Sequence, residues 1–164
     1  MLKGLGPRAT PALKAQLRLR GLNLDNLPPA FPIEDWTPHL VYIAATVFPE
    51  LPQEQALYET GVTFMRGWQQ TLMGSAVSQL LRIVGPARTL PRLERAFRTS
   101  NNFTMATATL LSPTSARVVL SDVHDVPTLW AGVLHGGLHI LGREGTVDVE
   151  DRTPPGCTLL LQWK

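Results

Sequence analysis

The chain has 164 residues, of which 44% are hydrophobic and 17% charged. This composition is typical of one globular domain and excludes a disordered or fibrous protein. A net charge of +2 is too small to indicate a nucleic-acid partner. No apolar run approaches the ~20 residues that cross a bilayer, and the basic start lacks the apolar region of a secretory signal. Because the single Cys157 has no partner for an internal disulfide, we expect one cytoplasmic domain over residues 1–164.

The first part of the chain, residues 1–99, has the pattern of a helical layer. The expected helices run from Pro11 to about Gly21, from Pro38 to Phe48, from Pro52 to about Gly85, and from Leu90 to about Thr99. The first two begin with Thr-Pro, which is typical of an N-cap followed by the first helical residue. Each glycine inside the third segment costs about 1 kcal/mol relative to alanine. We therefore expect either a break near Gly61 or a helix pair that packs unusually closely.

The second part, residues 100–164, changes to strand periodicity around one helix. The expected elements are strands at 103–111 and 116–120, a helix at 128–141, and strands at 146–150 and 158–163. The predicted fold class is α+β, with an N-terminal helical layer followed by a ββαββ antiparallel four-stranded sheet and one packed helix.

Landmarks over nearly the whole chain resemble a paralogous family of myxobacterial proteins of unknown function. The most specific are the run from Phe97 to Asn102 and the final Trp163. The others are Gly4-Leu5, Gly21 to Leu24, Phe31-Pro32 with Trp36, Phe48 to Pro52, Gly61, Thr71 to Gly74, Gly85 to Arg88, the helix from Gly132 to Gly142, and Gln162.

The order of elements is also similar to three more distant groups: haem-nitric-oxide sensors, vinyl-reductase-type ligand-binding domains and TRAPP vesicle-tethering domains. This resemblance implies small-molecule sensing or dimeric scaffolding, and fold alone does not carry function. Haem sensors of this architecture hold iron through a histidine on the helix that leads into the sheet. The corresponding stretch, Leu90 to Met105, contains no histidine. We therefore expect no haem, and the cofactor, if any, is unknown.

The histidines are the first candidates for chemistry. His135 and His139 are four residues apart on the predicted helix, a spacing at which two imidazoles can chelate a metal. His124, on the preceding loop, could complete a site. A zincin has glutamate after its first histidine, but Gly136 follows His135 here. The simpler interpretation places these histidines at the edge of a packed helix.

Arginines form the second candidate. Arg88, Arg92, Arg95 and Arg98 recur at helical spacing and could contact an anion or an acidic partner, although a solvated helix face explains them as well. The segment from Arg98 to Asn102 either shapes the junction between helix and sheet or lines a pocket there.

A ligand pocket between the helices and the sheet is the third candidate. Such a pocket is mostly apolar with a few polar groups, and Tyr42, Trp68, Asn102 and Met105 would supply both kinds if they converged.

The sequence contains no motif for a catalytic serine or a nucleotide cradle, and Cys157 reads as a structural cysteine, so no catalytic residue is assigned. The leading hypothesis is a non-catalytic cytosolic sensory or adaptor module that binds a small apolar molecule or a protein partner. One alternative is a metal-binding or enzymatic site around His124, His135 and His139. Another is a TRAPP-like structural homodimer without a ligand.

Overall fold

The C-terminal sheet is antiparallel throughout. The computed structural model describes residues 2–27, 32–100 and 103–164. Its strands are β1 (Ala106–Ser112), β2 (Ser115–Leu120), β3 (Gly145–Asp151) and β4 (Cys157–Trp163), in the order β1-β2-β4-β3. Helix α8 (Pro127–Ile140) connects the two hairpins. The predicted ββαββ arrangement and the α+β fold class are therefore confirmed.

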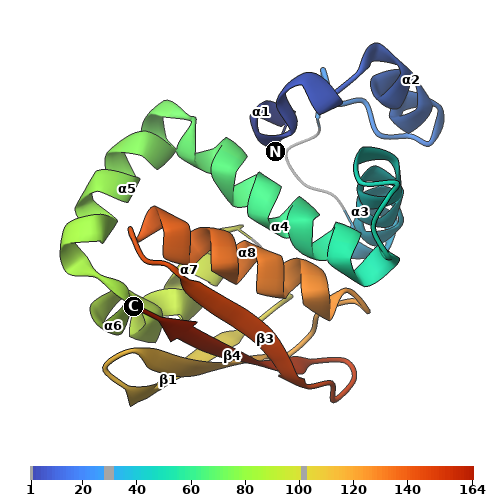
Figure 1. Cartoon of the computed structure of the whole chain (residues 1–164). Coiled ribbons are helices and arrows are strands. Elements are labelled where there is room, and N and C mark those ends of the chain that lie inside the picture. The colour runs from blue at the N-terminus through green and yellow to red at the C-terminus, as the bar shows by residue number, and fades with distance from the viewer. Residues whose placement is uncertain (1, 28–31, 101–102) are drawn as a thin grey trace.

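One face of this sheet is apolar because the strands alternate. On β4, Cys157, Leu159, Leu161 and Trp163 are buried, and the residues between them are more exposed. Side chains two residues apart lie on the same face of a strand, so these four share one side of the sheet. Helix α8 lies over that side of the sheet (Figure 1), and its Leu134 and Leu138 belong to the same core. The resulting core holds the C-terminal half together.

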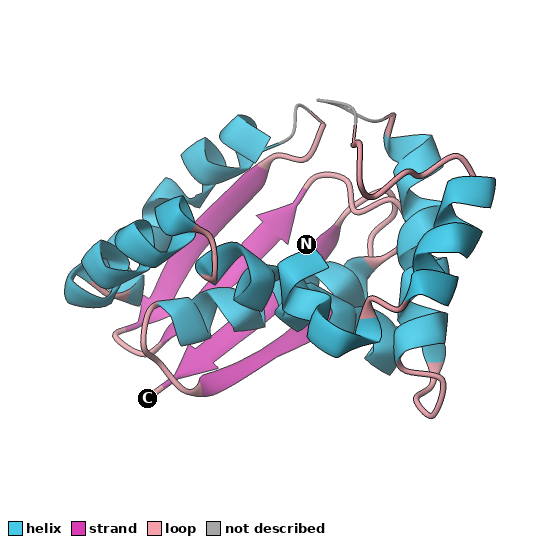
Figure 2. Cartoon of the chain, turned by 90° about the horizontal axis from the view of Figure 1, so that it is seen from above, coloured by secondary structure: helices cyan, strands magenta, loops and turns pink. Residues whose placement is uncertain are grey.

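The N-terminal half is helical and has a second core of its own. Its helices are α1 (Leu2–Leu5), η1 (Gly6–Arg8), α2 (Pro11–Leu19), α3 (Ile33–Val47), α4 (Gln53–Gln69), α5 (Leu72–Val84), α6 (Pro86–Thr89), η2 (Leu90–Arg92) and α7 (Leu93–Ser100). Leucines of α2 pack with the apolar face of α3 and with the start of α4. In Figure 1, α4 lies between α1 and α8, and Figure 2 shows the strands beneath the helical layer.

Two helix boundaries differ from the sequence prediction. Helix α3 begins at Ile33, with Glu34 and Asp35 in its first turn, and Pro38 lies inside it. The predicted start at Pro38 is therefore wrong. The long segment after Pro52 breaks at Thr71, whose hydroxyl oxygen accepts a hydrogen bond from the Gly74 amide at 3.0 Å and caps α5. The break between α4 and α5 is therefore marked by the threonine N-cap at Thr71 and not by a glycine inside the segment.

Gly61 takes part in close helix packing instead of a break. A Cβ on Gly61 would lie 2.2 Å from the Leu129 carbonyl oxygen, and one on Gly132 would lie 1.9 Å from the Tyr58 carbonyl oxygen. Both distances are impossible for real atoms, so α4 and α8 approach each other only because these two positions lack side chains. Such approach permits Cα–H···O contacts between helix backbones. The alternative of a closely packed helix pair is correct.

Candidate functional site

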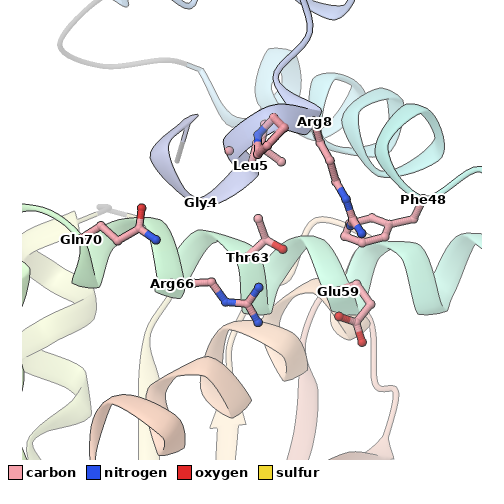
Figure 3. Close-up of a pocket in the computed structure, with 10 residues that line it drawn as sticks. Gly4, Leu5, Arg8, Phe48, Glu59, Thr63, Arg66 and Gln70 are labelled. Atoms are coloured by element: carbon pink, nitrogen blue, oxygen red, sulfur yellow. The ribbon is translucent and has the colours of Figure 1, made fainter.

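A surface pocket of about 480 Å³, half open to solvent and called the cavity below, lies between the N-terminal segment and α4. Ligand pockets of proteins fall in the range of roughly 300–1,000 Å³. Its lining combines backbone, apolar side chains and charged side chains. The lining residues are Gly4, Leu5, Gly6, Pro7, Arg8, Phe48, Glu59, Thr63, Arg66 and Gln70. In Figure 3, Gly4, Leu5 and Arg8 lie on the N-terminal side, Phe48 follows the end of α3 beside Arg8, and Glu59, Thr63, Arg66 and Gln70 are spaced along α4.

Two glycines shape the N-terminal wall of this cavity. Gly4 sits so close to α4 that a Cβ there would lie 2.0 Å from the Thr63 carbonyl oxygen. Gly6 has a φ of +52°, a left-handed conformation that glycine adopts without steric cost. The turn at Gly6 directs the chain into η1, where Arg8 folds back toward Phe48. The wall therefore depends on close contact at Gly4 and on the turn at Gly6.

The cavity carries two guanidinium groups and one carboxylate. Arg8 stacks over the ring of Phe48, with its Cζ 4.6 Å from the ring centroid, while Arg66 and Glu59 project from α4 (Figure 3). Within the described part of the chain, neither guanidinium has a carboxylate at ion-pair distance. Two other arginines do have close partners: Arg152 donates to both oxygens of Glu54, at 2.6 and 2.7 Å, and Arg117 donates to both oxygens of Glu150. The cavity thus holds unpaired positive charge next to an aromatic surface.

The residues proposed from sequence for a pocket do not line this cavity. Tyr42 lies beside α2, under the guanidinium of Arg20 at 4.1 Å, and packs on the N-terminal core. Trp68 is on the last turn of α4, and Met105 is 60% exposed just before β1. Asn102 falls outside the described residues. The three described residues belong to separate elements, and of them only Tyr42 packs on one of the two cores, so their convergence in one pocket stays a prediction.

The histidines separate into a pair and a single residue. The rings of His135 and His139 lie in contact, with centroids 4.4 Å apart and planes tilted by 56°, as their spacing on α8 predicts. His124 precedes α8 and packs edge-on against Phe103 at 4.9 Å. His124 lies before the start of α8 at Pro127, and the eight residues from Pro127 to His135 alone rise about 12 Å at 1.5 Å per residue. No group of three metal-ligating side chains forms among the described residues, so the structure does not assemble the three-histidine site that the sequence left open as an alternative.

The surroundings of His135 favour its neutral form. Burial lowers the pKa of His135, the charge of His139 lowers it further, and Glu59 and the Gly145 backbone raise it. Tyr58, 5.6 Å from His135 between ring centroids, has its pKa raised to about 12, mainly by burial. Near neutral pH the rings of His135 and Tyr58 are therefore favoured in their uncharged forms.

We expect the H139Q variant to raise the pKa of His135, because it removes the positive charge that disfavours a proton on the neighbouring ring. His139 is exposed, so the fold should tolerate the change. Titration of the His135 ring resonances by NMR measures the effect. An unchanged pKa would show that the two rings do not interact electrostatically.

The same lowered pKa predicts acid sensitivity. Between the ordinary histidine pKa of 6.5 and the lower value in the fold, the unfolded chain binds a proton that the folded chain does not. Stability contributed by neutral His135 is therefore complete above 6.5 and falls as the pH drops below it. Urea unfolding at about pH 7.5 and pH 5 should show a smaller acid loss in H135Q than in the wild type.

The arginine row is divided among three short elements. Arg88 lies in α6, Arg92 in η2, and Arg95 and Arg98 in α7, where the sequence predicts one continuous helix from Leu90. Pro91 lies in η2, a 3-10 turn over Leu90–Arg92 that takes the place of the first turn of the expected helix. Arg92 donates to the Arg88 carbonyl, and Arg98 forms an exposed ion pair with Glu94 at 3.6 Å. Their role as an anion or partner contact remains a prediction.

Cys157 is buried at the start of β4, facing α8. Burial raises the pKa of its thiol to about 11. Since the thiolate is the reactive form, we expect the native protein to react with a thiol reagent such as DTNB far more slowly than the urea-unfolded chain. Rapid native labelling at pH 8 would contradict this placement.

Helix α5 has an unusual distribution of side chains. Its inward residues are Gly74 and Ser78, whereas Leu72 is 95% exposed and Ile83 is 85% exposed. The exposed apolar face consists of Leu72, Met73, Val77, Leu80 and Ile83. The only charged residue of α5, Arg82, turns toward the Ile140 carbonyl oxygen at 3.3 Å. An apolar face of this kind on a protein surface commonly marks an interaction site.

The solved structures that resemble the chain are H-NOX domains. An H-NOX protein mutant from K. algicida, described as Fe(II) unliganded, has a TM-score of 0.71 at 9% identity and covers 99% of this chain and 94% of its own. An oxygen-binding H-NOX domain related to soluble guanylate cyclases has a TM-score of 0.68 at 11% identity, over 99% and 90%. An S. oneidensis H-NOX protein in the Fe(II)NO state has a TM-score of 0.66 at 9% identity, over 93% and 89%. At these identities the likeness establishes the fold. No curated protein matches the chain.

The helix that leads into the sheet does not fit a haem held through that helix. Helix α7 turns Phe97 inward, where its ring packs on Trp130 with centroids 5.3 Å apart. A hydrocarbon ring cannot ligate iron, and the residues from Leu90 to Met105 supply no histidine. The likeness to H-NOX domains thus extends to the backbone but not to an iron ligand on α7.

The cavity residues were not identified from the sequence, because no motif marks them. The only local signal was the Gly4-x-Gly6-Pro7 run, which indicates an unusual backbone before the first long helix.

In the part of the chain that is described, no helix is long and apolar enough to span a membrane. The family model for proteins of unknown function DUF2378 matches residues 1–164, and the chain therefore belongs to that family.

Proposed function

We propose that the protein is a non-catalytic, cytoplasmic ligand-binding module of H-NOX-like fold, with its ligand in the cavity between η1 and α4. The observation that carries this proposal is the 480 Å³ cavity, which has the size of a small-molecule site. It lies on the side of α4 away from α8. The space between α8 and the sheet holds the packed core of Leu134, Leu138, Leu159 and Leu161.

The sensory part of the proposal rests on the way the cavity is connected to the rest of the fold. Helix α4 contributes the cavity floor and also contacts α8 through Gly61 and Gly132. When two helix backbones are in direct contact, no side chain between them can rearrange to absorb a movement, so a shift of one helix moves the other. A ligand that shifts α4 would therefore shift α8 and the sheet beneath it.

Native mass spectrometry of the purified full chain, compared with its denatured mass, tests the proposal. A retained organic mass at one equivalent would support ligand binding and identify the ligand class. If the protein is bare, a thermal-shift screen of small metabolites follows. A bare protein that no compound stabilises would contradict the proposed function, and a stoichiometric metal mass would favour the His135–His139 pair instead.

A second candidate function, homodimerisation, is favoured by the apolar face of α5. We propose a second copy of the chain as its occupant, because the face has no charge that would repel an identical surface. An antiparallel pairing would place Leu72 of one α5 against Ile83 of the other. The helix is about 20 Å long at 1.5 Å per residue, so it would form the centre of an interface of standard size.

Sedimentation equilibrium tests the dimer. The L80D/I83D variant should be monomeric at a concentration where the wild type is dimeric. The matched control is Ser75→Asp, which adds a charge at an exposed polar position of the same helix. A monomeric wild type at all concentrations would contradict this candidate.

A further inference from the structure

We infer that the ligand of the η1–α4 cavity is a small amphipathic oxyanion, with its carboxylate or phosphate group at Arg66 and Arg8 and its apolar part toward Leu5 and Phe48. This inference rests on the proposed ligand-binding function and specifies the ligand's chemistry.

The charges of the cavity point to an anion. Arg8 and Arg66 contribute two positive charges against one negative charge from Glu59. A guanidinium binds a planar or tetrahedral oxyanion through paired N–H donors, and Arg is the residue best suited to such recognition. Because no described carboxylate pairs with either guanidinium, their donors are available to a ligand.

Arg8 is held in a position that suits this role. Arg8 is exposed, and its Cζ lies over the Phe48 ring at 4.6 Å from the centroid, a cation–π contact that favours this position of the guanidinium. Phe48 is itself buried, so the ring is a firm support. A guanidinium that is already oriented loses less freedom on binding than one on a mobile side chain.

The rest of the lining explains why the anion should carry an apolar group. Leu5 and Phe48 are buried side chains whose surfaces border the cavity, together with the ring of Pro7. Leu5 and Phe48 are only 3% and 5% exposed, so the apolar surface left in contact with water by an inorganic ion is mainly that of the exposed Pro7 ring. A short hydrocarbon body would cover it and gain the corresponding hydrophobic free energy.

The polar groups of α4 would complete the recognition. Thr63 lies between Arg66 and Glu59 along the helix, and Gln70 stands at its end (Figure 3). A hydroxyl and an amide can each donate to or accept from a ligand oxygen. Glu59, by contrast, repels an anion, so its charge should weaken the binding that the arginines provide.

Isothermal titration calorimetry with octanoate, octyl phosphate and octylamine tests the inference on the full chain. These probes share one hydrocarbon chain and differ in the charge and geometry of the head group. Octanoate or octyl phosphate should bind the wild type, and the stronger of the two identifies the preferred oxyanion. Octylamine should bind at least about tenfold more weakly, as expected when a charge-assisted hydrogen bond is lost.

Three variants assign the effect to the cavity. R66Q should weaken the anion by about tenfold, and E59Q should strengthen it severalfold by removing a repulsive charge. The control R92Q changes an exposed arginine outside the cavity and should leave the affinity unchanged. An R92Q loss equal to that of R66Q would indicate unspecific attraction and overturn the inference.

The outcomes separate this inference from the proposed function. If octylamine binds as tightly as the anions and R66Q has no effect, the cavity binds ligands but the anion preference is wrong. If none of the three probes binds and the native mass spectra and thermal-shift screen also find no ligand, both are wrong. If none of the probes binds but another organic ligand is retained, the charge of that ligand tests the anion preference. An anionic ligand supports the inference, and a neutral or cationic ligand overturns it.

Discussion

The G132A variant should unfold at a markedly lower urea concentration than the wild type. The added Cβ would lie 1.9 Å from the Tyr58 carbonyl oxygen, and the obstacle is backbone that no rotamer change can move aside. Helices α4 and α8 must therefore separate, which loosens the contact along their whole length. We expect a loss of at least about 2 kcal/mol in the free energy of unfolding, in the range for overpacked cores.

Gly137 provides the matched control five residues along the same helix. A Cβ at Gly137 would meet nothing within 4 Å, so alanine adds helix propensity without a clash. The G137A variant should be as stable as the wild type or gain up to about 1 kcal/mol. Equal losses in G132A and G137A would show that glycine is not needed for the contact between α4 and α8.

The L159A variant should lose about 2–5 kcal/mol, the range for deleting a buried leucine side chain. Leu159 is completely buried at the centre of β4, where it lies opposite Val118 of β2 and Val149 of β3. Neighbours on both sides and α8 above hold the site open, so the cavity left by the mutation cannot collapse easily. Urea unfolding measured by circular dichroism gives the change.

Leu160 is the corresponding control on the same strand. Its side chain is on the other face of the sheet and is only partly buried. L160A should therefore lose about 1 kcal/mol, less than half the effect of L159A. If the two variants are equally destabilised, the sheet does not have the single covered face described here.

The fold could be predicted where side-chain periodicity is strong. The alternation of Leu159, Leu161 and Trp163 defines β4 and its buried face, and the apolar residues of 128–141 define α8. The helical first half followed by ββαββ was therefore predictable from local pattern alone. The boundaries of the helices were less predictable. Helix α3 has Glu34 and Asp35 in its first turn and contains Pro38, whereas the sequence pattern predicts that it begins at Pro38.

The candidate site could not be predicted because it depends on tertiary contacts. Arg8 and Arg66 are far apart in the sequence and reach one cavity only because Gly4 lets α1 rest on the Thr63 carbonyl. The sequence instead favoured residue types with conspicuous chemistry, such as His124, which the fold places at the opposite end of α8 from His139. Spacing within a helix predicted the His135–His139 contact correctly, since that distance is set locally.

The most direct test of this account is to locate the bound ligand by NMR. The ¹H–¹⁵N spectrum of the full chain would be followed during titration with the ligand from native mass spectrometry, or with octanoate. We predict that the amide resonances of Gly4, Gly6, Thr63, Arg66 and Gln70 shift most, because these residues line the cavity. Shifts concentrated at Leu134, Val118 and Leu159, with the cavity amides unmoved, would place the ligand between α8 and the sheet and contradict the account.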